Sequence, residues 1–119
     1  MKHSLVLASL VLVAGLGGTA FAADMATGEQ ITRAIAGNTV QGSMASSGAY
    51  TEFYAVDGTI KGKDYTGKWS VSADKMCFDY GADPAMCWNV SIAGEDVSWI
   101  MDGKVEGSGT VVKGNPNNF

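Results

Sequence analysis

The chain has 119 residues and a net charge of −4 at pH 7, which suits one small domain built around a single core. Its basic residues are spread along the sequence and form no stripe, so the composition argues against binding to nucleic acid or to an anionic membrane surface. The one histidine, His3, precedes the cleavage site of an apparent export signal, and its removal excludes histidine-based catalysis, histidine-ligated zinc and histidine-ligated haem.

Residues 1–22 have the pattern of a Sec-type signal peptide. A short cationic head is followed by an apolar run over residues 5–16, and Ala20-Phe21-Ala22 is a typical cleavage site. The apolar run is too short for a membrane-spanning helix, which needs about 20 apolar residues. We therefore expect cleavage after Ala22 and a periplasmic or secreted product without a membrane anchor.

Residues 23–119 are expected to form one small domain that begins with a helix over about residues 27–36. Thr27 can cap this helix, Gln30 stands at the capping-box position, and Gly37 ends the last turn. A helix this short must dock on another element to persist. We expect it to pack over one end of a sheet.

From Asn38 onward, short segments of strand character alternate with glycine-containing turns, of which Asp57-Gly58 and Asp102-Gly103 are strong hairpin signals. Short connections pair each strand with the next in an antiparallel meander, and closure into a barrel removes the exposed edges. We expect a mainly β fold, an up-and-down meander of about eight strands in a small closed or nearly closed barrel, with a curved open sheet or a sandwich as the alternative. The expected strands cover residues 39–44, 50–56, 59–62, 68–72, 75–80, 85–92, 97–101 and 104–112, and an irregular tail covers 113–119.

Two cysteines, Cys77 and Cys87, flank a segment that is expected to fold back around Gly81 to Pro84. In an exported chain such a pair favours a structural disulfide, which contributes about 2–3 kcal/mol to stability. A metal-binding thiol pair and a redox-active pair are the alternatives. A redox pair usually needs closer spacing at the start of a helix, and neither cysteine lies in a helical pattern.

Alternation along the strands beside the cysteines places large apolar side chains on one face and polar side chains on the other. A two-residue turn at Ala73-Asp74 would put Trp69 opposite Phe78. Pairing of the two cysteines would put Met76 opposite Trp88. Both registers place the apolar set on the same face, so the cysteines are expected on the outer face.

The aromatic side chains of this apolar face are the candidate ligand-binding residues. In a small barrel such rings either fill the interior or line a cup, and the sequence leaves both arrangements open. The candidate ligand-binding residues are Trp69, Phe78, Trp88 and Trp99.

Carboxylate pairs are the remaining route to acid–base catalysis. The candidates are Asp79 with Asp83 and Glu52 with Asp64, and we interpret each as a solvated residue of the outer face or of a loop. The methionines lack the clustered Met-x-x-Met spacing of a copper site and are expected to fill the core. We expect no enzyme activity, no cofactor and no metal site.

Several short motifs are spread over nearly all of residues 23–119. They are Thr27-Gly-Glu-Gln-Ile31, Gly37-Asn-Thr-Val40, Tyr50-Thr-Glu-Phe-Tyr54, Asp57-Gly-Thr-Ile-Lys-Gly62, Gly67-Lys-Trp-Ser-Val71, Met76-Cys-Phe-Asp-Tyr80, Cys87-Trp88 and Gly114-Asn-Pro116. Together they resemble a group of small exported alphaproteobacterial proteins and domains without an assigned activity. The resemblance implies a small, mostly β exported domain of calycin- or lipocalin-like pattern, and it brings no catalytic residues.

Two functions from different classes fit these features. The first is a monomeric binding module that holds a small hydrophobic or aromatic ligand against the tryptophan-rich face. The alternative is a periplasmic protein-interaction module, either a hydrolase inhibitor or an accessory to an envelope sensor, which would use the hairpin that carries Asp79 and Asp83.

Overall fold

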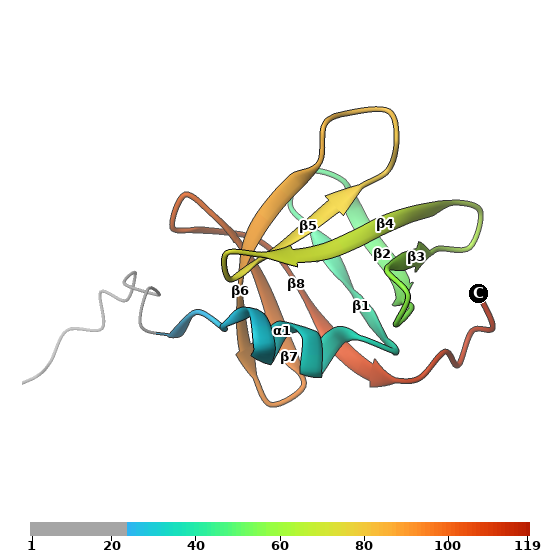
Figure 1. The fold of residues 1–119 in the computed structure, drawn as a ribbon, viewed down its shortest axis with the longest axis horizontal. Helices are drawn as coiled ribbons and strands as arrows, with labels where there is room; N and C mark the ends of the chain where they lie inside the picture. The colour runs from blue at the N-terminus through green and yellow to red at the C-terminus, as the bar shows by residue number, and fades with distance from the viewer. Residues whose placement is uncertain (1–23) are drawn as a thin grey trace, which may run out of the picture.

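A computed structural model describes residues 24–119, and the predicted signal peptide, residues 1–22, lies outside the described residues. The described chain forms one short helix and eight strands (Figure 1). The elements are α1 (Gly28–Ile35), β1 (Asn38–Met44), β2 (Gly48–Tyr54), β3 (Thr59–Lys61), β4 (Thr66–Ser72), β5 (Lys75–Asp79), β6 (Met86–Ala93), β7 (Asp96–Met101) and β8 (Lys104–Lys113).

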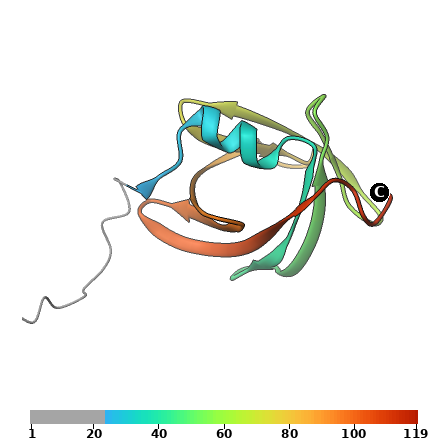
Figure 2. The ribbon, with the colours of Figure 1, turned by 90° about the horizontal axis from the view of Figure 1, so that it is seen from below.

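The strands form a closed antiparallel barrel. Each strand pairs with the next in the chain, and β8 pairs with β1 from Asn38↔Lys113 to Met44↔Gly107. Figure 2, which views the molecule from the end that carries α1, shows the strands following one another around a ring. The predicted eight-stranded meander is confirmed, and the alternatives of an open sheet or a sandwich are excluded.

The closing pair of strands, β1 and β8, approach each other where both contain glycine. Gly42 lies opposite Gly109, and a Cβ atom at Gly42 would overlap the backbone of Ser108 and Gly109. A Cβ atom at Gly109 would come within 2.6 Å of the Tyr50 hydroxyl oxygen. Glycine therefore permits both the closure of the barrel and the position of the Tyr50 ring.

The turns set the registers that the sequence predicts. Ala73 and Asp74 adopt φ angles of 49° and 58°, as a two-residue hairpin turn requires, and Trp69 lies opposite Phe78. Strand ends differ by up to two residues from the expected ones. For example, β2 starts at Gly48 because Gly48 still pairs with Met44, and Val56 lies in the following turn with 80% of its surface exposed.

Cys77 of β5 and Cys87 of β6 form a disulfide between directly opposed positions. The predicted disulfide and its register are therefore confirmed, and Met76 lies opposite Trp88 as expected. Since the cysteines alternate with Met76, Phe78 and Trp88, they belong to the outer face of the barrel.

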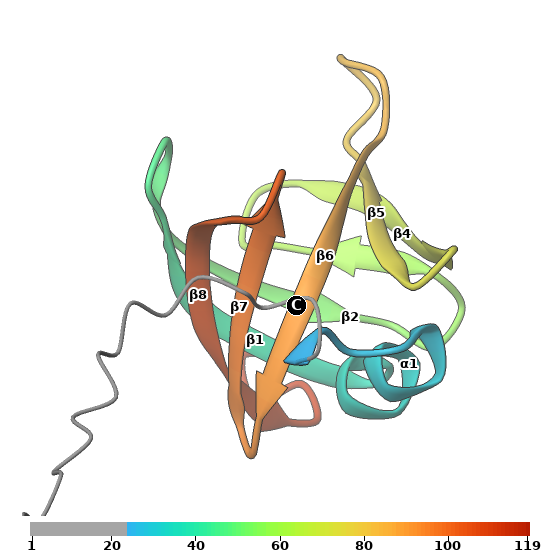
Figure 3. The same cartoon turned by 90° about the vertical axis from the view of Figure 1, so that its left-hand side faces the viewer.

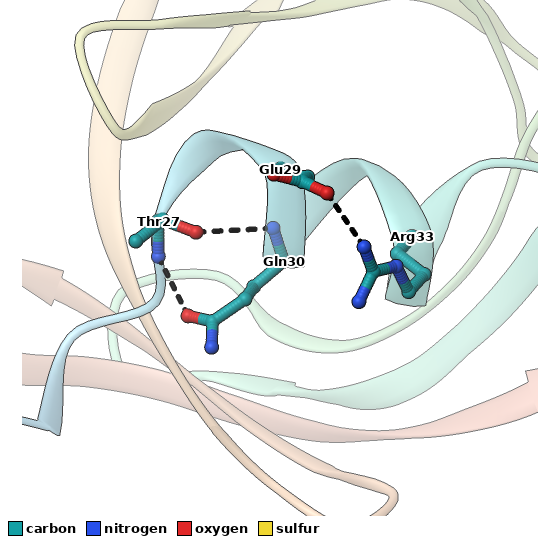
Figure 4. Close-up of polar contacts among 4 residues, drawn as sticks. All are labelled: Thr27, Glu29, Gln30 and Arg33. Atoms are coloured by element: carbon teal, nitrogen blue, oxygen red, sulfur yellow. Dashed lines mark hydrogen bonds and ion pairs between the residues drawn. The ribbon is translucent and has the colours of Figure 1, made fainter.

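The helix α1 begins with the predicted capping box (Figure 4). The Thr27 side chain accepts a hydrogen bond from the Gln30 backbone N–H at 3.2 Å, and the Gln30 side chain accepts one from the Thr27 N–H at 2.9 Å. The N–H of Gly28 donates to Asp74 Oδ1 at 2.7 Å. This last bond ties the start of α1 to the β4–β5 turn, so the helix is fixed at this end of the barrel.

The core joins α1 to the inside of the barrel. Ile31 and Ile35 of the helix are fully buried and belong to one apolar cluster with strand residues such as Val40, Ile60 and Val90. The prediction that α1 packs over one end of the sheet is therefore confirmed. Within residues 24–119 no helix is both long enough and apolar enough to cross a membrane.

Candidate functional site

A cavity of about 450 Å³ opens at the end of the barrel opposite α1. Inward side chains of β2, β5, β6 and β7 line it, and residues of the β1–β2, β3–β4 and β5–β6 loops surround its mouth. Figure 3 shows the β1–β2 and β5–β6 loops projecting at the top of the barrel, with α1 at the bottom. The barrel thus has one end filled by the core and one hollow end.

The polar centre of the cavity is Glu52, which is only 6% exposed. Its carboxylate accepts hydrogen bonds from the Tyr54 hydroxyl at 2.7 Å and from the Tyr65 hydroxyl at 2.7 Å. The Tyr80 hydroxyl lies 2.9 Å from Oε2 and 3.1 Å from Oε1. Burying a carboxylate is costly, and these charge-assisted hydrogen bonds offset that cost.

The interpretation of Glu52 as a solvated outer-face or loop residue is wrong. In β2, Tyr50, Glu52 and Tyr54 share one face, and all three line the cavity. A carboxylate can occupy this face because tyrosines from two other parts of the chain supply the hydrogen bonds that it needs.

The other carboxylates of the proposed pairs do lie in solvent-exposed positions. Asp64 is exposed in the β3–β4 loop, and Asp79 is exposed at the end of β5, where it accepts a hydrogen bond from the Gly81 N–H at 2.9 Å. Asp83 is also exposed, but it lies at the mouth of the cavity.

Tyr50 connects the cavity wall to a second hydrogen-bond chain. The Trp99 indole N–H donates to the Tyr50 hydroxyl at 2.7 Å, and this hydroxyl donates to the Ser108 carbonyl oxygen at 3.0 Å. Both side chains are thereby held in fixed orientations against β8.

Every tyrosine of the chain belongs to this site, and the pKa of each is raised above the usual value of 10. Burial is the main cause for all four, and the negative charge of Glu52 adds to it. For Tyr54, Tyr65 and Tyr80 the hydrogen bond donated to Glu52 also raises the pKa. Their hydroxyls therefore remain protonated donors at neutral pH.

Three of the four candidate ligand-binding aromatics line the cavity, namely Phe78, Trp88 and Trp99. Phe78 packs edge-on against Trp99, with ring centroids 5.4 Å apart. Trp69 lies elsewhere: its indole N–H donates to the Ala55 carbonyl oxygen at 2.9 Å, and its ring packs edge-on against Tyr54 in the core.

The sequence-based candidate set omitted Glu52 and the tyrosines that bind it. The available signal was the alternation in Tyr50-Thr-Glu-Phe-Tyr54, which gives Glu52 the same face as both tyrosines. The same alternation places Phe53 on the opposite face.

The lining is acidic as well as aromatic. Glu52 and Asp83 are its charged members, and it contains no lysine, arginine or histidine from the described part of the chain.

Comparison of the chain with protein-family models, curated proteins and solved structures finds no match.

Proposed function

We propose that this protein is a non-enzymatic binding module that holds a small hydrophobic or aromatic molecule in the open end of its barrel. The observation that carries the proposal is the aromatic cavity of about 450 Å³. Ligand pockets in proteins commonly measure about 300–1,000 Å³ and are mostly apolar with a few convergent polar groups. Phe78, Trp88 and Trp99 supply the apolar wall. The polar group is the Glu52 cluster, which consists of Glu52 and the three tyrosines that donate to it, Tyr54, Tyr65 and Tyr80.

The filled core at the α1 end supports the same proposal. Since α1 and the residues packed beneath it stabilise the barrel, the hollow end does not have to fill itself with side chains. We place the protein in the periplasm or outside the cell, in line with the signal-peptide pattern and with a disulfide that needs an oxidising compartment.

A fluorescent reporter tests the proposal. N-phenyl-1-naphthylamine is neutral and aromatic, and its emission rises in an apolar site, so the native protein should enhance it in a saturable way. Met44→Trp places a bulky ring at the mouth and should weaken this binding, whereas Ser43→Trp on the exposed outer face of the same strand should not. A native protein that neither enhances the reporter nor binds quinones, fatty acids or any other small apolar or aromatic molecule would contradict the proposal.

A protein-interaction module is the second candidate function. It is favoured by exposed apolar surface on both sides of the cavity mouth, where Tyr65, Tyr80 and Met86 are 45%, 48% and 51% exposed. A pull-down from periplasmic extract should then recover one stoichiometric partner, and replacing Asp83 and Pro84 by glycine should abolish recovery. A stoichiometric partner that is retained by this variant would argue against the β5–β6 loop as the contact.

A further inference from the structure

The polar end of the cavity offers hydrogen-bond acceptors and few donors. Tyr54, Tyr65 and Tyr80 each have one hydroxyl proton, and all three are directed to Glu52. What these phenols still offer to a ligand is the lone pairs of their oxygen atoms. A carboxylate has about four acceptor positions, and three phenol protons cannot saturate all of them, since the one proton of Tyr80 is shared between Oε1 and Oε2.

The charge of Glu52 has no basic partner in the described structure. Among residues 24–119, the one ion pair joins Arg33 to Glu29 on the exposed surface of α1. Asp83 at the mouth adds a second negative charge, and no basic side chain from residues 24–119 lines the cavity. An anionic ligand would therefore meet repulsion, whereas a cation would supply the missing counter-charge.

The walls suit an organic cation with an apolar body. Aromatic faces attract ammonium groups within about 6 Å of the ring, and Phe78, Trp88 and Trp99 supply such rings beside the Glu52 cluster. The same rings give a hydrophobic or aromatic body a surface to bury against. A small inorganic cation would leave most of the cavity unfilled.

We propose that the ligand is a small aromatic or apolar amine, whose ammonium group binds Glu52 and the phenol oxygens and whose body lies against Phe78, Trp88 and Trp99. This inference rests on the proposed binding function and specifies the chemical class of the ligand.

Three probes with the same body and different charge test it on the native protein by isothermal titration calorimetry at pH 7. They are 4-phenylbutylamine, 4-phenylbutan-1-ol and 4-phenylbutyrate, which are cationic, neutral and anionic. The amine should bind at least about tenfold more tightly than the alcohol, which equals about 1.4 kcal/mol, and the carboxylate should bind most weakly. An alcohol that binds as tightly as the amine would overturn the assignment of charge while leaving the binding function in place. Absence of binding by all three would count against the binding function itself.

A matched pair of variants assigns the preference to Glu52. Glu52→Gln keeps the size of the side chain and removes its charge, so the preference for the amine over the alcohol should disappear. Glu95→Gln makes the same change in the exposed β6–β7 turn at the other end of the barrel and should preserve the preference. An amine preference that persists in a folded Glu52→Gln variant would overturn the role of Glu52. The ranking on the native protein decides the charge assignment even if this variant fails to fold.

The lysine side chain of a protein presents the same ammonium group as a small amine. A further probe therefore distinguishes a small-molecule amine from a protein lysine as the ligand. Nα-acetyl-lysine methylamide lacks the aromatic body and should bind at least about tenfold more weakly than 4-phenylbutylamine. Tighter binding of the lysine derivative would overturn the assignment to a small amine.

Discussion

At the scale of single residues, the site depends on how the burial of Glu52 is compensated. Its carboxylate lies on the inner face of β2, and its three tyrosine partners come from β2 itself, from the β3–β4 loop and from the residue that follows β5. Tyr54 is the most deeply buried of the three, with 1% of its surface exposed, whereas Tyr65 is 45% exposed. The three hydrogen bonds should therefore contribute unequally to stability.

Replacing Tyr54 by phenylalanine should lower the free energy of unfolding by about 1.5–3 kcal/mol, because a buried charged acceptor loses a donor. Tyr65→Phe should cost less, because water can replace the lost hydroxyl at a half-exposed position. Urea unfolding of the two variants measures the difference. Equal losses would show that burial does not control the strength of these bonds.

The raised pKa values of the four tyrosines predict loss of stability in alkali. Below about pH 10 the tyrosines are protonated in both the folded and the unfolded chain. As the pH rises above 10, the unfolded chain loses phenol protons that the folded chain retains, so unfolding becomes more favourable.

Absorbance at the phenolate band measures this effect directly. Between pH 10 and 11 the native protein should show less phenolate than free tyrosine does, and unfolding at constant pH should increase the phenolate signal. A native titration curve that matches free tyrosine would contradict the hydrogen-bonded cluster.

At the scale of elements, the strands, turns and disulfide register could be predicted because their signals are local. Alternation fixes the face of each residue, and Ala73-Asp74 and Asp102-Gly103 fix the hairpins between consecutive strands. The sequence did not reveal the Glu52 cluster for two reasons. A charged side chain usually lies in solvent, and Tyr65 and Tyr80 become neighbours of Glu52 only when the barrel forms. Whether the interior is filled or hollow also depends on the whole barrel, for example on the glycines of β8.

The turn between β4 and β5 should stabilise α1 through Asp74. Asp74→Gly removes the acceptor of the Gly28 N–H and tolerates the positive φ angle, so it should cost about 1 kcal/mol of stability. Asp102→Gly changes a residue with a similar φ of 51° in the β7–β8 turn and should be nearly neutral. Thermal unfolding of both variants checks this, and equal effects would mean that the contact with α1 contributes nothing.

The disulfide should stabilise the β5–β6 hairpin beside the cavity mouth. Replacing both cysteines by serine should lower the free energy of unfolding by about 2–3 kcal/mol, since the cross-link restricts the unfolded chain. Because the sulfurs belong to the outer face, the variant should still bind ligand when it is folded. Loss of binding by a folded variant would show that the cross-link also shapes the site.

At the scale of the whole molecule, the two ends of the barrel have different roles. The end beneath α1 contains the buried core, and the opposite end contains the cavity with its aromatic wall and acidic polar centre. This division explains how so small a domain can remain folded and still contain a hollow site. It also separates the three tryptophans, because Trp88 and Trp99 line the cavity and Trp69 does not.

The most direct test of the account is a ¹⁵N–¹H NMR titration of the native protein with 4-phenylbutylamine, observed at the three indole N–H resonances. Ligand in the cavity should shift the resonances of Trp88 and Trp99, while that of Trp69, which donates to the Ala55 carbonyl oxygen, should stay in place. If all three resonances remain unchanged up to millimolar amine, or if only that of Trp69 moves, the cavity is not the binding site.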